Sequence, residues 1–184
     1  MRQSIGGAWL FSISIILMMF IIAYVTITID YSNAYQLKDD VALYIEQYNG
    51  MNKDSATKIL QRMKAKKFTT KINCNKYYDS TTYYSTSKYD GDPSNHYYGL
   101  VNYNTTSLGT AFPRDPGLAY ICIYKYKVVK QGDKAEDKMD KVFYSVSTAF
   151  GFNFPILGDI FDYRVTGETG TINYPHDADG FNFE

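Results

Sequence analysis

The chain opens with a long, uninterrupted apolar run. Residues 5–29 read IGGAWLFSISIILMMFIIAYVTITI and contain no charged residue. At 1.5 Å of rise per residue, this run would form a helix about 37 Å long, which is enough to cross a bilayer with some tilt. Arg2 precedes the run, and acidic residues follow it from Asp30 onward. Because basic residues favour the cytoplasmic side, we expect a cytoplasmic N-terminus and an external C-terminal part.

Two other interpretations of the run stay open. One is a cleaved secretory signal, with Ser32 and Ala34 as the small residues before the cut, although its apolar core would far exceed the usual length of about 7–15 residues. The other is a core helix of a soluble protein, although the remaining chain is too small to bury such a helix on every side. We therefore predict a membrane-spanning helix.

The helical pattern continues beyond the apolar run. No Pro or Gly occurs between Gly7 and Gly50, so a single helix from about residue 5 to about residue 49 is predicted. We divide the chain into residues 1–30, the N-terminus and membrane helix, and residues 31–184, an external domain that includes this helix extension. The apolar positions that recur at helical spacing are Tyr31, Ala34, Tyr35, Val41, Ile45 and Tyr48. A plain anchor with a helical stalk is the simpler alternative.

The remainder of the chain predicts one short helix and several strands. Asn52 or Asp54 can cap a helix that ends near Lys66. β-branched and aromatic residues dominate the later segments, whose connections are short enough for antiparallel neighbours. We predict an α+β domain in which the long helix lies across an antiparallel sheet. The predicted strands are 68–73, 118–129, 142–154 and 160–174.

Residues 142–154 show the clearest strand alternation. One predicted face carries Ser145, Ser147 and Gly151. The opposite face carries larger side chains, namely Val142, Tyr144, Val146, Thr148, Phe150 and Phe152.

A tyrosine-rich region separates the short helix from the strong strands. Residues 77–116 combine Tyr with Ser, Thr, Asn, Gly and Pro, and they show no helical period. This composition suits adaptable binding surfaces, so we predict a loop that contacts a partner or surface ligand. The alternative is that the tyrosines pack the loop onto the sheet. The candidate contact residues are Tyr83, Tyr84, Tyr89, Tyr97 and Tyr98.

Charge and motif content exclude several classes of function. The chain has 19 Lys and Arg against 19 Asp and Glu, so its formal net charge is zero. Nucleic-acid binding requires a basic excess that displaces counterions, and we expect no nucleic-acid partner. His96 and His176 belong to no nucleophile motif, and no glycine-rich phosphate loop occurs. We therefore expect no catalytic activity and no cofactor.

Two cysteines lie in the region predicted to be external. Cys74 follows the predicted strand 68–73, and Cys122 lies within 118–129. Outside the cell a disulfide between them is expected, and closing this loop would stabilise the domain by about 3–4 kcal/mol. A metal site is the weaker alternative, because the cysteines and histidines lack closely spaced ligand pairs.

The layout of the chain resembles a known family. A short N-terminus ends in Gly6-Gly7, the helix continues as TIDYSNAYQLKDDVALYIEQYNG, and a small domain closes with FNFPILGDIFDYRVTGETGTI. This arrangement is similar to type IV pilin-like proteins, and more narrowly to the TadE-like minor pilins, or pseudopilins, of tight-adherence pili. The resemblance implies a structural subunit of a surface pilus or secretion assembly, with other pilin-like subunits or assembly proteins as partners of the helix.

The resemblance also implies a processing site. A prepilin peptidase would cut after Gly6 or Gly7, and it usually meets a glutamate five residues later. Phe11 and Ser12 occupy those places here, which favours a minor or uncleaved membrane-held component.

Small residues on the apolar helix indicate where a second helix can approach closely. The candidate packing positions are Gly7, Ala8, Ser12, Ser14 and Ala23. The alternative to a pilin-like function is a single-pass membrane-anchored binding module, in which the helix only tethers the tyrosine-rich loop.

Overall fold

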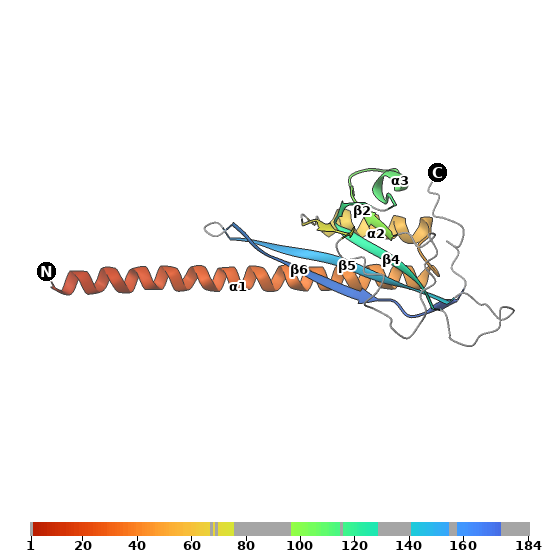
Figure 1. The fold of residues 1–184 in the computed structure, drawn as a ribbon. Helices are drawn as coiled ribbons and strands as arrows, with labels where there is room; N and C mark the ends of the chain where they lie inside the picture. Colours follow the sequence, from red (N-terminus) through yellow and green to blue (C-terminus); the bar gives the residue numbers. More distant parts are fainter. Residues whose placement is uncertain are drawn as a thin grey trace.

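One helix runs along almost the entire length of the molecule, and a small domain packs against its C-terminal half (Figure 1). The structure, a computed structural model, describes residues 2–66, 68, 70–75, 97–114, 116–128, 141–154 and 158–173. At residues 2–6, 127, 128, 141, 152–154 and 158–162 it describes the backbone alone.

The long helix α1 spans Arg2–Gln47 and is unbroken. It ends where Asn49 and Gly50 adopt positive φ angles of 53° and 128°, and the Gly50 amide donates to the Ile45 carbonyl at 2.8 Å. The predicted end near residue 49 is therefore confirmed within two residues. The side chains that face the domain are completely buried and form the buried stripe of α1, namely Ala34, Leu37, Val41 and Ile45.

A second helix, α2 (Lys53–Lys66), packs beside α1. Asn52 caps it as predicted, because its Oδ1 accepts hydrogen bonds from the amides of Asp54 and Ser55 at 3.0 Å each. Its apolar face is buried, and Arg62 forms an ion pair of 2.6 Å with Asp40 of α1.

The strands form a five-stranded antiparallel sheet and a small two-stranded one. The larger sheet has the order β2-β4-β5-β6, and β7 pairs with the N-terminal end of β5. Its strands are β2 (Tyr97–Leu100), β4 (Ile121–Val128), β5 (Lys141–Phe154), β6 (Gly158–Glu168) and β7 (Ile172–Asn173). The smaller sheet pairs β1 (Ile72–Asn73) with β3 (Leu118–Ala119). A one-turn helix, α3 (Leu108–Ala111), lies between β2 and β3 in the chain.

The sheet confirms the α+β architecture and corrects several boundaries. The predicted strand 118–129 divides at Tyr120 into β3 and β4, and 160–174 divides into β6 and β7. Among the described residues of 68–73, which leave out residue 69, the last two form a strand. The region 77–116 is not one loop, because residues 97–100 form β2 and residues 108–111 form α3.

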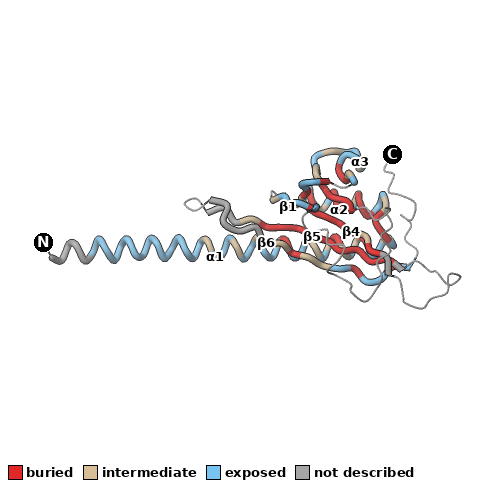
Figure 2. The backbone as a smooth tube through the Cα atoms, in the orientation of Figure 1, coloured by how far each residue is buried: buried red, intermediate tan, exposed pale blue. Residues whose placement is uncertain are grey.

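Residues on both faces of the central strands β4 and β5 are buried, and these strands are largely red in Figure 2. Val142, Tyr144 and Val146 of β5 belong to the core that contains the buried stripe of α1 and the apolar face of α2. The alternate face also has a core, in which Phe143 and Ala149 share a cluster with both cysteines. The predicted alternation is therefore present, and Ser145 and Ser147 on the second face are buried as well.

Candidate functional site

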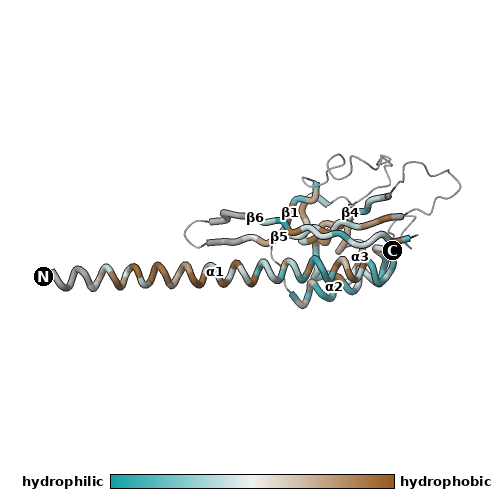
Figure 3. The backbone as a smooth tube through the Cα atoms, turned by 90° about the horizontal axis from the view of Figure 1, so that it is seen from below, coloured by the Kyte–Doolittle hydropathy of each residue, from teal (hydrophilic) through white to brown (hydrophobic). Residues whose placement is uncertain are grey.

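The most conspicuous surface is the N-terminal half of α1, which projects beyond the domain. We call residues 7–29 the apolar segment. Large apolar side chains there are open to the surroundings, including Trp9 (71% exposed), Phe11 (68%) and Tyr24 (72%). Figure 3 shows the hydrophobic residues along this part of the helix. By length and composition, the helix is able to cross a membrane.

Three hydroxyl groups of the apolar segment are paired within the helix itself. Ser12 donates to the Ala8 carbonyl at 3.0 Å, Thr26 to the Ile22 carbonyl at 2.9 Å, and Thr28 to the Tyr24 carbonyl at 2.9 Å. A polar group in hydrocarbon is costly unless it is hydrogen-bonded, so this pairing suits an apolar environment.

The five predicted helix-packing residues do not form a single stripe. Successive residues of an α-helix are rotated by about 100°. Gly7 and Ser14 therefore lie within about 20° of each other, on the side of α1 opposite its buried stripe. Ser12 and Ala23 lie on the same side as that stripe, and Ala8 lies between the two sides. Only Gly7 and Ser14 share the side turned away from the domain.

The predicted processing residues lie at the start of the helix. Gly6 and Gly7 belong to α1, which continues without interruption on both sides of them. A Cβ added at Gly7 would meet no atom within 4 Å. A second chain can therefore approach the backbone of α1 closely at Gly7.

The apolar segment meets the domain at an aromatic cluster. Phe150 of β5 is only 6% exposed and packs with Ala34 and Val165, and Ile27 packs against the same cluster. The ring of Tyr31 meets Phe150 edge-on, with centroids 5.5 Å apart. This cluster fixes the level at which α1 leaves the domain.

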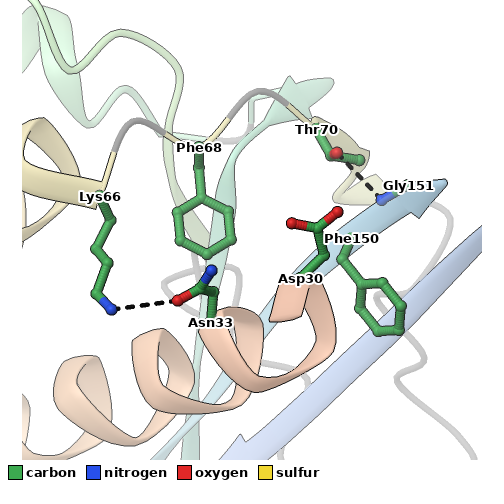
Figure 4. A pocket seen from close by; sticks show the side chains of 7 residues that line it. All are labelled: Asp30, Asn33, Lys66, Phe68, Thr70, Phe150 and Gly151. Atoms are coloured by element: carbon green, nitrogen blue, oxygen red, sulfur yellow. Dashed lines mark hydrogen bonds between the residues drawn. The ribbon is translucent and has the colours of Figure 1, made fainter. Parts of the chain in front are cut away.

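A small open pocket of about 110 Å³ lies at the same junction (Figure 4). Lys66 donates to Asn33 Oδ1 at 3.3 Å and to Gln36 Oε1 at 3.1 Å, which ties the end of α2 to α1. Across the pocket, the Gly151 amide donates to Thr70 Oγ1 at 3.1 Å. The lining residues are Asp30, Asn33, Lys66, Phe68, Thr70, Phe150 and Gly151.

Asp30 is the acidic group of this pocket. Burial raises the pKa of its carboxyl above the ordinary value of 3.8. In the described part of the chain, no ion pair involves Asp30, and no group of three His, Cys, Asp or Glu side chains is arranged to hold a metal ion. The contacts of Lys66 in this pocket join α1 to the domain.

The two cysteines form the predicted disulfide. The structure joins Cys74 to Cys122 with a Cα–Cα distance of 5.7 Å. The hydroxyl of Tyr124 donates to the Cys74 carbonyl at 2.9 Å, and the Cys74 amide donates to the Gly117 carbonyl at 3.0 Å. The bridge therefore fastens the end of β1 to β4.

The candidate contact tyrosines do not form one described surface. Tyr83, Tyr84 and Tyr89 lie outside the described residues. Tyr97 and Tyr98 lie in β2 and are only 8% and 5% exposed, because they pack into the two cores. These two residues therefore have little surface to offer a partner.

Sequence reasoning did not find the aromatic cluster or the Asp30 pocket. Phe150 was placed on the correct strand, but no sequence signal shows that it meets Tyr31, more than a hundred positions away. The charge pattern around Lys66 is equally explained by stabilisation of a helix C-terminus, so it does not point to Asn33.

Fold and site together define a class: an α+β protein in which one long apolar helix projects from a disulfide-bonded domain. Comparisons with protein-family models, with curated proteins and with solved structures find no match.

Proposed function

We propose that this chain is a structural, non-enzymatic subunit of a surface pilus or related secretion assembly, held in the membrane by α1. One observation carries the proposal. A single unbroken helix of 46 residues is apolar and exposed over its first half, while its second half carries the buried stripe of the domain core.

The exposed half of α1 requires contact with lipid or with another protein. An apolar surface of this extent is unfavourable in water and typically marks a contact with a membrane or another protein. Since the hydroxyls of Ser12, Thr26 and Thr28 are already paired inside the helix, both lipid and the packed core of a helix bundle are suitable surroundings for them. A pilin-like subunit requires both, first in the membrane and then in the assembly.

The second half of α1 makes the connection rigid. It packs on β5, β6 and α2 along the domain, so the helix does not act as a loose tether. A movement of the apolar segment is therefore transmitted to the whole domain. This property favours a subunit that is positioned by its helix over a module that is only anchored by it.

The disulfide supports an external domain. Bonds of this kind persist in oxidising surroundings, so the Cys74–Cys122 bond favours a domain outside the cell. We propose a cytoplasmic N-terminus, one membrane crossing within residues 5–29, and an extracellular or pilus-exposed domain.

Fractionation of the cells that produce the protein tests this function. We expect the chain to resist carbonate extraction from membranes and also to appear in surface material that is released by shearing. A variant with Tyr83, Tyr84 and Tyr89 changed to Ser should still enter the sheared fraction, because the helix and the sheet build the assembly. A chain that is confined to membranes, and loses binding to a surface ligand in that variant, is an anchored binding module instead.

A further inference from the structure

The second helix returns along α1 toward the apolar segment. Arg62 of α2 forms its ion pair with Asp40 of α1 at 2.6 Å. Four residues later, Lys66 donates to Asn33, which lies seven residues earlier in α1 than Asp40. Each step forward along α2 is therefore a step back along α1. The end of α2 is the part of that helix that lies nearest to the apolar segment.

The Asp30 pocket, the cavity of about 110 Å³ described above, lies immediately beyond the apolar segment. Asp30 is the first residue after that segment, and Asn33 follows about 4.5 Å further along the helix axis. The headgroup layer on each side of a bilayer is about 5–8 Å thick. If residues 5–29 occupy the hydrocarbon, the Asp30 pocket lies at the level of the outer headgroups.

The pocket presents one negative and one positive side chain without charged partners. Among the described residues, neither Asp30 nor Lys66 forms an ion pair. Lys66 donates to two neutral amide oxygens, those of Asn33 and Gln36, although an ammonium group has three donors. In the view of Figure 4, the charged groups of Asp30 and Lys66 lie on opposite sides of the Phe68 ring. A ligand that carries both charges can therefore neutralise both side chains.

The surroundings of Asp30 favour an ammonium ion. Burial raises the pKa of its carboxyl because the ionised form is incompletely hydrated, and a cation beside the carboxylate stabilises that form. The rings of Phe68 and Phe150 line the same pocket, and aromatic rings attract ammonium ions to their faces. A primary ammonium also donates hydrogen bonds to a carboxylate, which a quaternary ammonium has no N–H to do.

We propose that the Asp30 pocket binds the headgroup of a zwitterionic phospholipid of the phosphatidylethanolamine type in the outer leaflet. The primary ammonium of the lipid donates to the Asp30 carboxylate, and its phosphate accepts from the N–H of Lys66 that neither amide uses. The proposal rests on the membrane anchorage proposed above. The bound lipid holds the junction between α1 and the domain at the surface of the bilayer.

Native mass spectrometry of the full-length protein in detergent micelles tests the proposal. The protein is mixed with phosphatidylethanolamine, phosphatidylcholine and phosphatidylglycerol of identical acyl chains, and the lipid retained per chain is measured. Free phosphoethanolamine, added separately, distinguishes a membrane lipid from a soluble ligand. The pocket variants are Asp30→Asn and Lys66→Gln. The control variants make the same charge changes at exposed positions of α2, namely Asp54→Asn and Lys58→Gln.

We expect the wild-type protein to retain several-fold more phosphatidylethanolamine than either other lipid, and little free phosphoethanolamine. Asp30→Asn should abolish the preference over phosphatidylcholine, because these two lipids differ only in the methyl groups on the headgroup nitrogen. Lys66→Gln should lower the retention of phosphatidylethanolamine several-fold, and both control variants should match the wild-type protein. A denaturation midpoint at or above the wild-type value shows that Asp30→Asn is folded.

Three results overturn the headgroup site. They are equal retention or a preference for phosphatidylglycerol in the wild-type protein, a preference that Asp30→Asn leaves unchanged, and free phosphoethanolamine retained as strongly as the lipid. Flotation with phosphatidylcholine vesicles tests the anchorage separately. A wild-type chain that stays in the aqueous fraction overturns the membrane anchorage, whereas a chain that floats but shows no headgroup preference overturns the headgroup site alone.

Discussion

The ring of Tyr31 meets the ring of Phe150 edge-on, with centroids 5.5 Å apart. This contact joins the first turn after the apolar segment to the middle of the longest strand. Phe150 also stacks on Tyr163 of β6 at 5.5 Å, so one side chain links the helix to both β5 and β6. The position of these two strands relative to the apolar segment depends on this residue.

Phe150→Ala should destabilise the domain by about 3–5 kcal/mol, because it removes a buried aromatic ring and leaves a cavity. Chemical denaturation in detergent micelles, followed by tyrosine fluorescence, measures this loss. Leu118→Ala is the control, since Leu118 is 59% exposed and should change stability by less than about 0.5 kcal/mol. Equal effects of the two variants would contradict the packing of α1 on β5.

Gly99→Ala should be strongly destabilising, by about 1–3 kcal/mol or more. A Cβ at Gly99 would clash with Pro116 Cγ and would lie 2.7 Å from Ala119 Cβ, and neither atom belongs to a flexible side chain that can move away. Gly117→Ala is the matched control, because a Cβ there meets no atom within 4 Å. The difference between the two denaturation midpoints tests the close approach of β2 to the segment before β4. Similar midpoints would contradict the short distance between β2 and this segment in the structure.

Loss of the disulfide should cost about 3–4 kcal/mol, since the bridge closes a loop of 48 residues. The double variant Cys74→Ser/Cys122→Ser should match the wild-type protein in the presence of a reductant. If a reductant leaves the wild-type denaturation midpoint unchanged, the bridge is absent or contributes nothing.

Ser14→Leu should weaken helix association in membranes by several-fold, because Gly7 and Ser14 form the small-residue surface on the side opposite the domain. Ser12→Leu makes the same chemical change on the domain side and should have little effect. Energy transfer between labelled chains, measured as the lipid is diluted, reports the association. If Ser14→Leu and Ser12→Leu weaken association equally, α1 has no preferred side for helix association.

Asp30→Asn should stabilise the protein at neutral pH and have no effect in strong acid. Burial raises the pKa of Asp30 in the folded state, so ionisation opposes folding once the pH rises above the unfolded value of 3.8. Below that value the carboxyl is protonated in both states and the penalty disappears. Thermal unfolding of both proteins from acid to neutral pH measures the difference, and a difference that does not vary with pH would contradict this account.

The elements that were predicted correctly from the sequence are those with a local hydrophobic period. The features that were missed depend on pairing between distant parts of the chain. The 3.6-residue pattern of α1 and the alternation of β5 are local signals, and both elements were found. β2 was missed because its four residues, YYGL, show no alternation, and it is a strand through its pairing with β4. The disulfide was expected from two isolated cysteines, whereas the Lys66–Asn33 contact requires the placement of α2 beside α1, which no local pattern specifies.

The central claim is that α1 is retained from Ala8 onward, with this apolar part of the helix embedded in a membrane or an assembly. Intact mass and N-terminal sequencing test it most directly, on protein recovered separately from membranes and from sheared surface material. The account predicts that both forms keep the chain from Ala8 onward, with a start at Gly7 or Ala8 in the sheared material if a prepilin peptidase acts. A chain that starts at Tyr35 would contradict it, because the apolar segment would then be a removed signal.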